Sequence, residues 1–176
     1  MRVRLVAYLG NARTQVQVDV GFGDVVSPEP LEAKYPTILD FPAPVLRTYP
    51  KETVVAEKLE AIIRLGVTNT RLKDFFDLWA LSGAFEFDGP LLTTAVGATL
   101  ERRQTPIPRD VPPALELVFA ENAEPVWRAF CRRIDVDDAP LFVDVIREIR
   151  GFVLPVCEAI LNETSPGAWT PGGGWR

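Results

Sequence analysis

The sequence predicts an α+β fold in which a small antiparallel or mixed N-terminal sheet precedes a helical C-terminal lobe. Two observations predict it. β-branched and alternating apolar residues crowd positions 3–20, and apolar residues recur with helical spacing from Lys51 onward. The 176 residues suffice for one domain with a core, or for two small lobes sharing one. We expect strands plus two helices in residues 1–86, a helical lobe in 87–164 and an irregular tail in 165–176.

Two strands are predicted at the start of the chain. "VRLVAYL" (3–9) and "TQVQVDV" (14–20) are separated by a Gly-Asn pair, which favours a tight reversal. The valines of the second strand share one face, whereas Gln17 and Asp19 share the other. Further on, "PTIL" and "APVLRTY" predict short extended segments that the neighbouring prolines restrict to sheet edges or bends.

Helices account for most of the remaining chain. Gly66 is expected to end the first helix as a C-cap, and Asn69 or Thr70 is expected to cap the second. Asp88 predicts an N-cap, with Pro90 in the first turn of the helix that follows. The tail "SPGAWTPGGGWR" has no regular period, which predicts a surface-lying or frayed end. The expected helices span 51–66, about 70–83, 88–103, 123–133 and 139–161.

Charge argues against a general nucleic-acid-binding domain. The net charge is -5, so the chain lacks the overall positive field that attracts a phosphate backbone. Local arginine clusters exist, and we interpret them as solvated helix faces. They are Arg102–Arg103, Arg132–Arg133, and Arg147 with Arg150.

Composition also narrows the chemistry. The chain has no histidine, which excludes Ser-His-Asp and Cys-His hydrolases and histidine-ligated metals. Cys131 and Cys157 are too few for a zinc site, and their apolar helical surroundings predict buried free thiols. No run approaches the roughly 18 apolar residues of a membrane helix, and no signal peptide opens the chain. We therefore expect a cytoplasmic protein with no membrane partner.

Lys58 is the first candidate functional residue. Helical geometry places Glu57, Glu60 and Arg64 together on one face of the 51–66 helix, which we expect to face water. Lys58 instead falls within the apolar arc, on the row of Val54, Ala61 and Leu65. A lysine in that position either extends its amine to solvent or serves a buried or cleft-facing purpose. Geometry alone leaves these two alternatives open.

The segment "RLKDFFDLWAL" (71–81) holds the next candidates. Lys73, Asp74 and Asp77 lie together on a helix that is apolar almost all round, which predicts a buried or sandwiched helix. A Lys73–Asp77 ion pair at i, i+4 explains two of these charges structurally, but it leaves Asp74 without a partner. The expected core stripe consists of Leu72, Phe75, Phe76 and Trp79.

Asp19 is the last candidate, because its carboxylate stands at a strand end before a glycine turn. Alone it reads as an exposed strand residue. Combined with Lys58 and the helix-borne aspartates, it suggests metal–phosphate chemistry, since carboxylates hold Mg²⁺ and lysine contacts a triphosphate. These groups are expected to converge on one open cleft.

Three segments carry a family resemblance: "VQVDVGFGD", "YPKETVVAEKLEAIIRLG" and "NTRLKDFFDLWAL". Together with "LLTTAVGATLERRQTPIP", "VWRAF" and "FVDVIREIRGFVLPV", they resemble the AbiEii/AbiGii toxin family of nucleotidyltransferases over nearly the whole chain. The most specific part is the AEKL helix followed by the K-D-x-x-D-L pattern.

The resemblance implies a polymerase-β-like nucleotidyltransferase core, here partial, with a helical C-terminal lobe. It implies the toxin half of a bacterial toxin–antitoxin or abortive-infection system, which transfers a nucleotide from NTP with Mg²⁺ to an RNA, such as tRNA, or a protein acceptor. An antitoxin protein is then an expected partner. By position, Asp19 would be a metal-binding carboxylate, Lys58 and Lys73 would contact the nucleotide, and Asp74 and Asp77 would be the helix-borne catalytic acids.

The sequence departs from the family at one motif. The family places a Gly-Ser turn and an Asp-x-Asp strand, which carries the principal metal ligands, before the position of Asp19. Neither Gly10-Asn11 nor Asp135-x-Asp137 supplies that pattern on a strand. We therefore expect residues 1–176 alone to be catalytically impaired. The alternative is a non-enzymatic interaction module or a degenerate remnant, and a truncated sheet edge would also favour a homo-oligomer.

Overall fold

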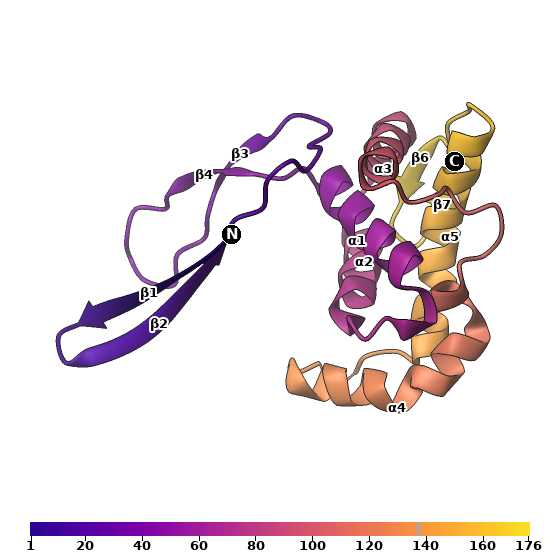
Figure 1. Cartoon of the computed structure of the whole chain (residues 1–176). Helices are drawn as coiled ribbons and strands as arrows, with labels where there is room; N and C mark the ends of the chain where they lie inside the picture. Colours follow the sequence, from indigo (N-terminus) through magenta and orange to yellow (C-terminus); the bar gives the residue numbers. More distant parts are fainter. Residues whose placement is uncertain (137) are drawn as a thin grey trace.

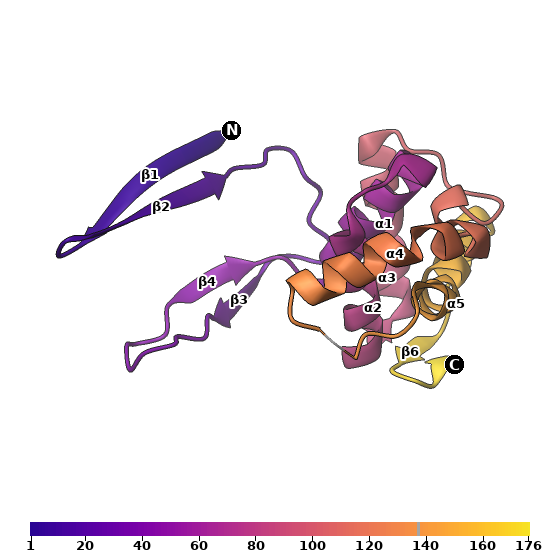
Figure 2. The same ribbon diagram turned by 90° about the horizontal axis from the view of Figure 1, so that it is seen from below.

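The computed structural model describes residues 1–136 and 138–176 and confirms the predicted α+β class. Two β-hairpins project from a body of helices, and a small third sheet lies against that body (Figure 1). The hairpins extend to the same side of the helical body in a view turned by 90° (Figure 2).

The first hairpin pairs β1 (Arg2–Leu9) with β2 (Ala12–Asp19) in antiparallel register. Gly10 adopts a φ of 58° at the turn, a left-handed conformation that glycine reaches without a steric penalty. Val3 pairs with Val18 and Leu5 with Val16, so side-chain alternation gathers most of the hairpin's apolar residues on one face, while Val6 and Tyr8 lie on the other. We define the apolar hairpin face as Val3, Leu5, Ala7, Leu9, Val16 and Val18.

The second hairpin pairs β3 (Leu31–Lys34) with β4 (Val45–Thr48). The prediction from "APVLRTY" is confirmed, because β4 lies within it. The prediction from "PTIL" is wrong, since residues 36–39 lie in the loop between the strands. The proline at its start cannot donate to a strand ladder, and the pairing strand forms just before it.

The first two helices are α1 (Lys51–Leu65) and α2 (Leu72–Ala84), and a short 3₁₀ turn, η1 (Gly66–Thr68), follows α1. Gly66 has a φ of 54° at the end of α1, as expected of a C-cap glycine. The predicted cap of α2 needs correction. Arg71 occupies the N-cap position without a side-chain bond, and Asn69 Oδ1 instead accepts a hydrogen bond from the Arg71 N–H at 2.8 Å.

The third helix, α3 (Gly89–Arg103), begins as predicted. Asp88 Oδ1 accepts a hydrogen bond from the Leu91 N–H at 2.9 Å, and Pro90 occupies the first turn. The short turn η2 (Pro113–Leu115) lies between α3 and the fourth helix, α4.

The last two helices differ from the prediction at their starts. Helix α4 (Leu117–Arg133) begins at Leu117 and not at Ala123, and it contains Pro125. Helix α5 (Phe142–Leu161) begins at Phe142 and not at Ala139. Glu124 of α4 explains that second boundary, because its Oε2 accepts a hydrogen bond from the Phe142 N–H at 2.6 Å and so caps α5 from another helix.

The C-terminal tail is ordered, so the expectation of a frayed end is wrong. Strands β5 (Phe87–Asp88), β6 (Ala168–Thr170) and β7 (Gly174–Trp175) form an antiparallel sheet. Trp169 is buried and donates its indole N–H to Ser82 O at 2.8 Å, and the indole of Trp175 donates to Phe152 O at 3.0 Å. Aromatic burial with satisfied indole donors holds these short strands in place.

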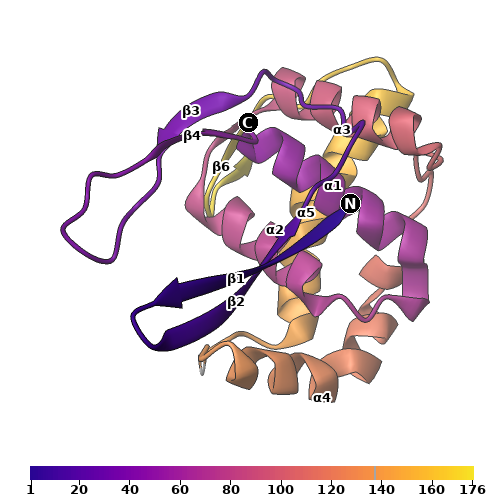
Figure 3. The same ribbon diagram turned by 60° about the vertical axis from the view of Figure 1, so that its left-hand side comes forward.

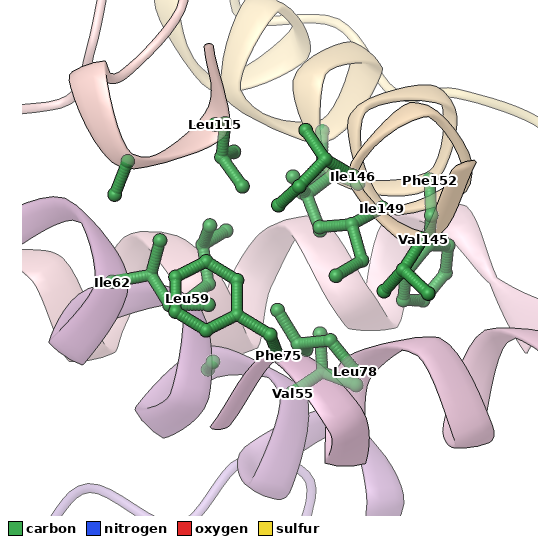
Figure 4. Close-up of a cluster of buried hydrophobic side chains, with 14 of the residues drawn as sticks. Val55, Leu59, Ile62, Phe75, Leu78, Leu115, Val145, Ile146, Ile149 and Phe152 are labelled. Carbon is green, nitrogen blue, oxygen red and sulfur yellow. The ribbon is translucent and has the colours of Figure 1, made fainter. Parts of the chain in front are cut away.

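The hydrophobic core lies between the helices. Helix α1 packs against α2 and α3, and α5 packs against α2, α3 and α4. Seen from the hairpin side, α5 runs behind α1 and α2 (Figure 3). Phe75 lies at the centre, surrounded by Leu59, Leu78, Ile146 and other fully buried side chains (Figure 4). This cluster extends from Val55 to Trp169 and so crosses the expected boundary at residue 86.

The structure also bears on the predictions about the two cysteines and about membrane-spanning helices. Cys131 and Cys157 are buried free thiols, as predicted, and burial raises the pKa of Cys157 to about 12. Within the described part of the chain, no helix is long and apolar enough to cross a membrane.

Candidate functional site

Lys58 joins helices α1 and α2. Its Nζ lies 2.7 Å from Asp74 Oδ1 and 2.8 Å from Asp77 Oδ2, which are adjacent on α2 because they are three residues apart. The Asp74 side chain is 1% exposed and that of Lys58 is 20% exposed. The amine therefore turns inward, toward α2, while remaining accessible from one side. Of the two alternatives left by the sequence, extension of the amine into solvent is wrong, because Lys58 is held in ion pairs with Asp74 and Asp77.

Two further cations complete this cluster. Lys73 Nζ lies 2.7 Å from Asp77 Oδ2, which is the expected i, i+4 pair. Arg71 Nε lies 3.0 Å from Asp74 Oδ2, but the angle is outside the hydrogen-bond range, so this buried oxygen has no hydrogen bond within the described chain. Three cations thus surround two carboxylates and leave the cluster with a positive excess.

The pKa shifts keep the Lys58–Asp77 pair ionised. Burial alone would lower the pKa of Lys58, but hydrogen bonds to Asp74 and Asp77 outweigh it and raise that pKa. Burial alone would raise the pKa of Asp77, but hydrogen bonds from Lys58 and Lys73 outweigh it and lower that pKa. Both groups are therefore charged at neutral pH.

A cavity of about 330 Å³ opens beside this cluster, between α1, α2 and α4. Its basic lining residues are Lys58, Arg71, Lys73 and Arg133, and Asp74 is its acidic lining residue. We call it the cationic cavity. Arg133, in the last turn of α4, also lies 5.5 Å from the ring centroid of Phe130. With Asp77, which pairs with Lys58 and Lys73 behind the lining, four cations face two carboxylates, so the site keeps a positive excess.

Sequence reasoning missed two of these groups. Arg133 was interpreted as part of a solvated helix face, and it is indeed exposed, yet it also lines the cavity. Arg71 was not singled out, although it directly precedes the helix that carries Asp74. The position of Arg71 one turn before Asp74 could have indicated it as a site residue. Nothing in the sequence indicates Arg133, because only the packing of α4 brings it near the cavity.

Asp19 stands apart from this cavity. It ends β2, its side chain is 56% exposed, and it pairs with Arg2 Nε at 2.7 Å and with Gln17 Nε2 at 3.0 Å. The hydrogen bond from Arg2 holds its pKa below the usual value. None of these contacts involves α1 or α2, and Asp19 does not line the cationic cavity. The structure brings Lys58, Lys73, Asp74 and Asp77 together and leaves Asp19 on the projecting hairpin (Figure 1).

The expected wet face of α1 also needs correction. Glu60 is buried, and its Oε1 accepts hydrogen bonds from Thr105 Oγ1 at 2.8 Å and Arg64 Nε at 2.9 Å. Glu57 is partly buried and pairs with Arg103 of α3 at 3.1 Å. The physical reason is that α3 packs over this face of α1, which the periodicity of α1 alone does not reveal.

The residues present fit phosphate better than a resident metal ion. Both α2 carboxylates are already held by ammonium groups, and the described residues contain no group of three or more carboxylate, cysteine or histidine ligands placed for a metal. The Asp135-x-Asp137 pattern includes Asp137, which lies outside the described residues. No chemical step is therefore assigned to Mg²⁺ at these positions.

The sequence matches the model of a known protein family over most of its length. A family model described as "Nucleotidyl transferase AbiEii toxin, Type IV TA system" matches residues 1–155. The chain belongs to the AbiEii family. The predicted resemblance is confirmed, and the match covers the hairpins and all five helices up to Pro155 of α5. Searches of curated proteins and of solved structures gave no match.

Membership of the AbiEii family makes the chain a nucleotidyltransferase-type toxin of a type IV toxin–antitoxin system, with an antitoxin as its counterpart. Lys58 and Asp74, which the sequence resemblance singled out, are in direct contact and both line the cationic cavity.

Proposed function

We propose that this AbiEii toxin binds the phosphates of a nucleoside triphosphate in the cationic cavity and transfers a nucleotide to an RNA or protein acceptor. The observation that carries the proposal is the convergence of Lys58, Arg71, Lys73 and Arg133 on one cavity. NTP and tRNA pools place such a reaction in the cytoplasm. In this reaction class, Mg²⁺ bound to the triphosphate neutralises charge that develops on the phosphates.

The chain's own residues suit the binding and positioning of phosphate. Asp74 and Asp77 hold the Lys58 amine in place before any ligand arrives, so little reorganisation is needed to bind an anion. Lys73 and Arg133 have exposed side chains that reach the cavity from α2 and α4. Cations fixed in this way stabilise negative charge on the transferred phosphoryl group and on the departing pyrophosphate.

We further propose that residues 1–176 alone bind nucleotide more readily than they transfer it. Asp19 is the carboxylate that the family resemblance singles out for metal binding, and its hydrogen bonds come from Arg2 and Gln17 of its own hairpin. The test is incubation with labelled NTPs, Mg²⁺ and total RNA or protein, with gel detection of label transfer. Efficient transfer by this chain alone would refute the proposed impairment and leave the binding proposal standing.

The binding proposal is tested by calorimetric titration with ATP, using Arg133→Gln and its neighbour Arg132→Gln. Arg133 lines the cavity and Arg132 does not, so they form a matched pair at the end of α4. Loss of one charge-assisted phosphate contact predicts about tenfold weaker binding for Arg133→Gln. Equal affinities for the two variants would contradict the assignment of the cavity.

A second candidate function, a protein-interaction module, is favoured by the apolar hairpin face. Leu5 is 52% exposed and Val18 is 43% exposed, and two-stranded hairpins are marginal without a covering layer. The chain exposes 11248 Å² in total. A compact monomer of this length exposes roughly 2,700 Å² less. A standard interface buries about 800 Å² per partner, so the excess exposed surface is large enough for one such interface.

The occupant that we propose for this face is a second copy of the chain, because a two-fold axis lets one apolar face cover its equivalent. Leu5→Lys places a charge on the face, and Gln15→Lys places the same charge on the opposite face of the hairpin. Light scattering should show a dimer for the parent and for Gln15→Lys, and a monomer for Leu5→Lys. A monomeric parent at micromolar concentration would refute self-association.

A further inference from the structure

An apolar groove lies next to the cationic cavity, between η1, the start of α2 and α4. Its volume is about 530 Å³, within the range of small-molecule sites. Its apolar lining residues are Val67, Leu72, Val118, Phe119, Ala123 and Val126. We call it the apolar groove. Val67 and Val118 are more than half exposed, so the groove opens to solvent.

The apolar groove and the cationic cavity adjoin each other. Thr70, Leu72 and Val126 line both, so a ligand that fills one reaches the boundary of the other. The two halves differ sharply in charge. The cavity gathers four cations, whereas the ionisable side chain lining the groove is Glu116. The combined site therefore has one basic end and one apolar end.

We propose that the apolar groove holds the base of the nucleoside triphosphate whose phosphates occupy the cationic cavity. This inference rests on the proposed function and adds the substrate's orientation to it. A nucleotide has the same division, since a planar base with apolar faces is joined to a strongly anionic tail. Placing the tail among the four cations leaves the neighbouring groove as the surface that removes the base from water.

The rim of the groove suits the polar edge of a base. Glu116 and Asn122 are exposed and line the groove at the start of α4. A carboxylate only accepts hydrogen bonds, so Glu116 matches the exocyclic amino groups of adenine, cytosine and guanine. Uracil has no exocyclic amino group, but its ring N3–H can donate to the same carboxylate. Glu116 can therefore accept a hydrogen bond from each of the four bases.

Asn69 provides a second, independent observation at the groove. It is 5% exposed and lines the groove, and its Oδ1 is used by the Arg71 N–H. Its Nδ2 is buried and has no hydrogen-bond partner among residues 1–136 and 138–176. An unsatisfied buried donor is costly, and a ring nitrogen or carbonyl of a base would relieve it. Because this nitrogen is covered, that contact requires a small shift of the groove wall.

The experiment compares ATP with inorganic tripolyphosphate, both with Mg²⁺, by isothermal titration. Tripolyphosphate occupies the cationic cavity alone, so the affinity difference reports what the nucleoside adds. Val118→Asn removes an exposed apolar contact without adding charge, and Val45→Asn makes the same change on β4, away from the groove. Circular dichroism checks that each variant is folded.

The parent is expected to bind ATP about tenfold more tightly than tripolyphosphate, because burying one apolar contact of the base is enough to give a difference of that size. Val118→Asn should reduce ATP affinity severalfold and leave tripolyphosphate affinity unchanged, while Val45→Asn should change neither. Equal affinities for both ligands, unaffected by Val118→Asn, would overturn the base site and leave the phosphate site intact. Failure of both ligands to bind would overturn the proposed function and this inference together.

Discussion

Residues 1–49 and the helical body from Lys51 onward are held in place by different forces. Within residues 1–49 no side chain is buried, and the two hairpins are defined by backbone ladders. The body instead has a continuous core that reaches from Val55 to Trp169. Local pairing shapes the first region, whereas packing between distant segments shapes the second. Groups on the body are therefore more firmly placed than groups on the hairpins.

This difference in packing separates the candidate residues into a group on the helical body and one residue on the hairpin. Lys58 and Asp74 lie on two helices that share a core, so their 2.7 Å contact is supported by the buried side chains beneath it. Asp19 lies on a hairpin whose side chains are solvent-exposed or half-buried. The same contact distance, 2.7 Å for Arg2–Asp19, thus carries less energy there.

The largest effect is expected from Phe75→Ala. Phe75 is fully buried and its ring lies 5.4 Å from Phe142 and 5.9 Å from Phe119. Its truncation should lower the free energy of unfolding by about 3–5 kcal/mol, measured by urea denaturation. Leu5→Ala on the apolar hairpin face serves as the control and should cost less than about 1 kcal/mol when it is measured on the monomer, below the concentration at which this face self-associates. A comparable loss for monomeric Leu5→Ala would show that the helical body covers this face of the hairpin in solution.

Lys58→Met should cause the second-largest loss of stability, because it leaves the Asp74 carboxylate buried without its hydrogen-bonded cation. Breaking a buried pair costs about 3–5 kcal/mol, and partial exposure of Lys58 places this change near about 3 kcal/mol. Adding Asp74→Asn removes the uncompensated charge and should recover part of the stability. If the double variant is less stable than Lys58→Met, the two side chains do not form the coupled pair that the structure shows.

Local signals in the sequence were sufficient for several features of the fold. Gly66 and Asp88 act within one turn of their own helices, so their caps could be predicted. The start of α4 and the ordered tail could not. Residues 117–123 are helical because Ala120 and Trp127 pack into the core, and Trp169 is held by Ser82, far away in sequence. Strands of two or three residues contain no period to detect.

The candidate site divides in the same way. The positions of Lys58 and Asp74 on their helices follow from a 3.6-residue period, so each could be selected from the sequence. Their mutual contact depends on how α1 crosses α2, and Arg133 enters only through the packing of α4. Glu60 was misplaced for the same reason, since α3 covers it.

Acid should weaken the body through Asp77. Its folded-state pKa is lowered below 3.8 because hydrogen bonds from Lys58 and Lys73 outweigh its burial. A lowered pKa contributes stability that is fully present above 3.8 and is lost as pH falls through the folded value. Urea denaturation between neutral pH and pH of about 3 should show this loss, of about 1 kcal/mol or less, since Asp77 is partly exposed. Asp77→Asn should flatten that part of the pH profile, and an unchanged profile would contradict the assignment.

The smallest effect is expected from Arg2→Met on the first hairpin. The Arg2–Asp19 pair is more than half exposed on both sides, so water screens it and its loss should change stability within the error of denaturation. Lys58→Met removes a cation from Asp74 at the same distance and also from Asp77 at 2.8 Å, so the two substitutions differ in burial and in the number of ion pairs lost. A measurable loss for Arg2→Met that persists in high salt would mean that the Asp19 end of the hairpin is covered in solution. That result would place Asp19 in a shielded environment and restore it as a candidate partner for the cationic cavity.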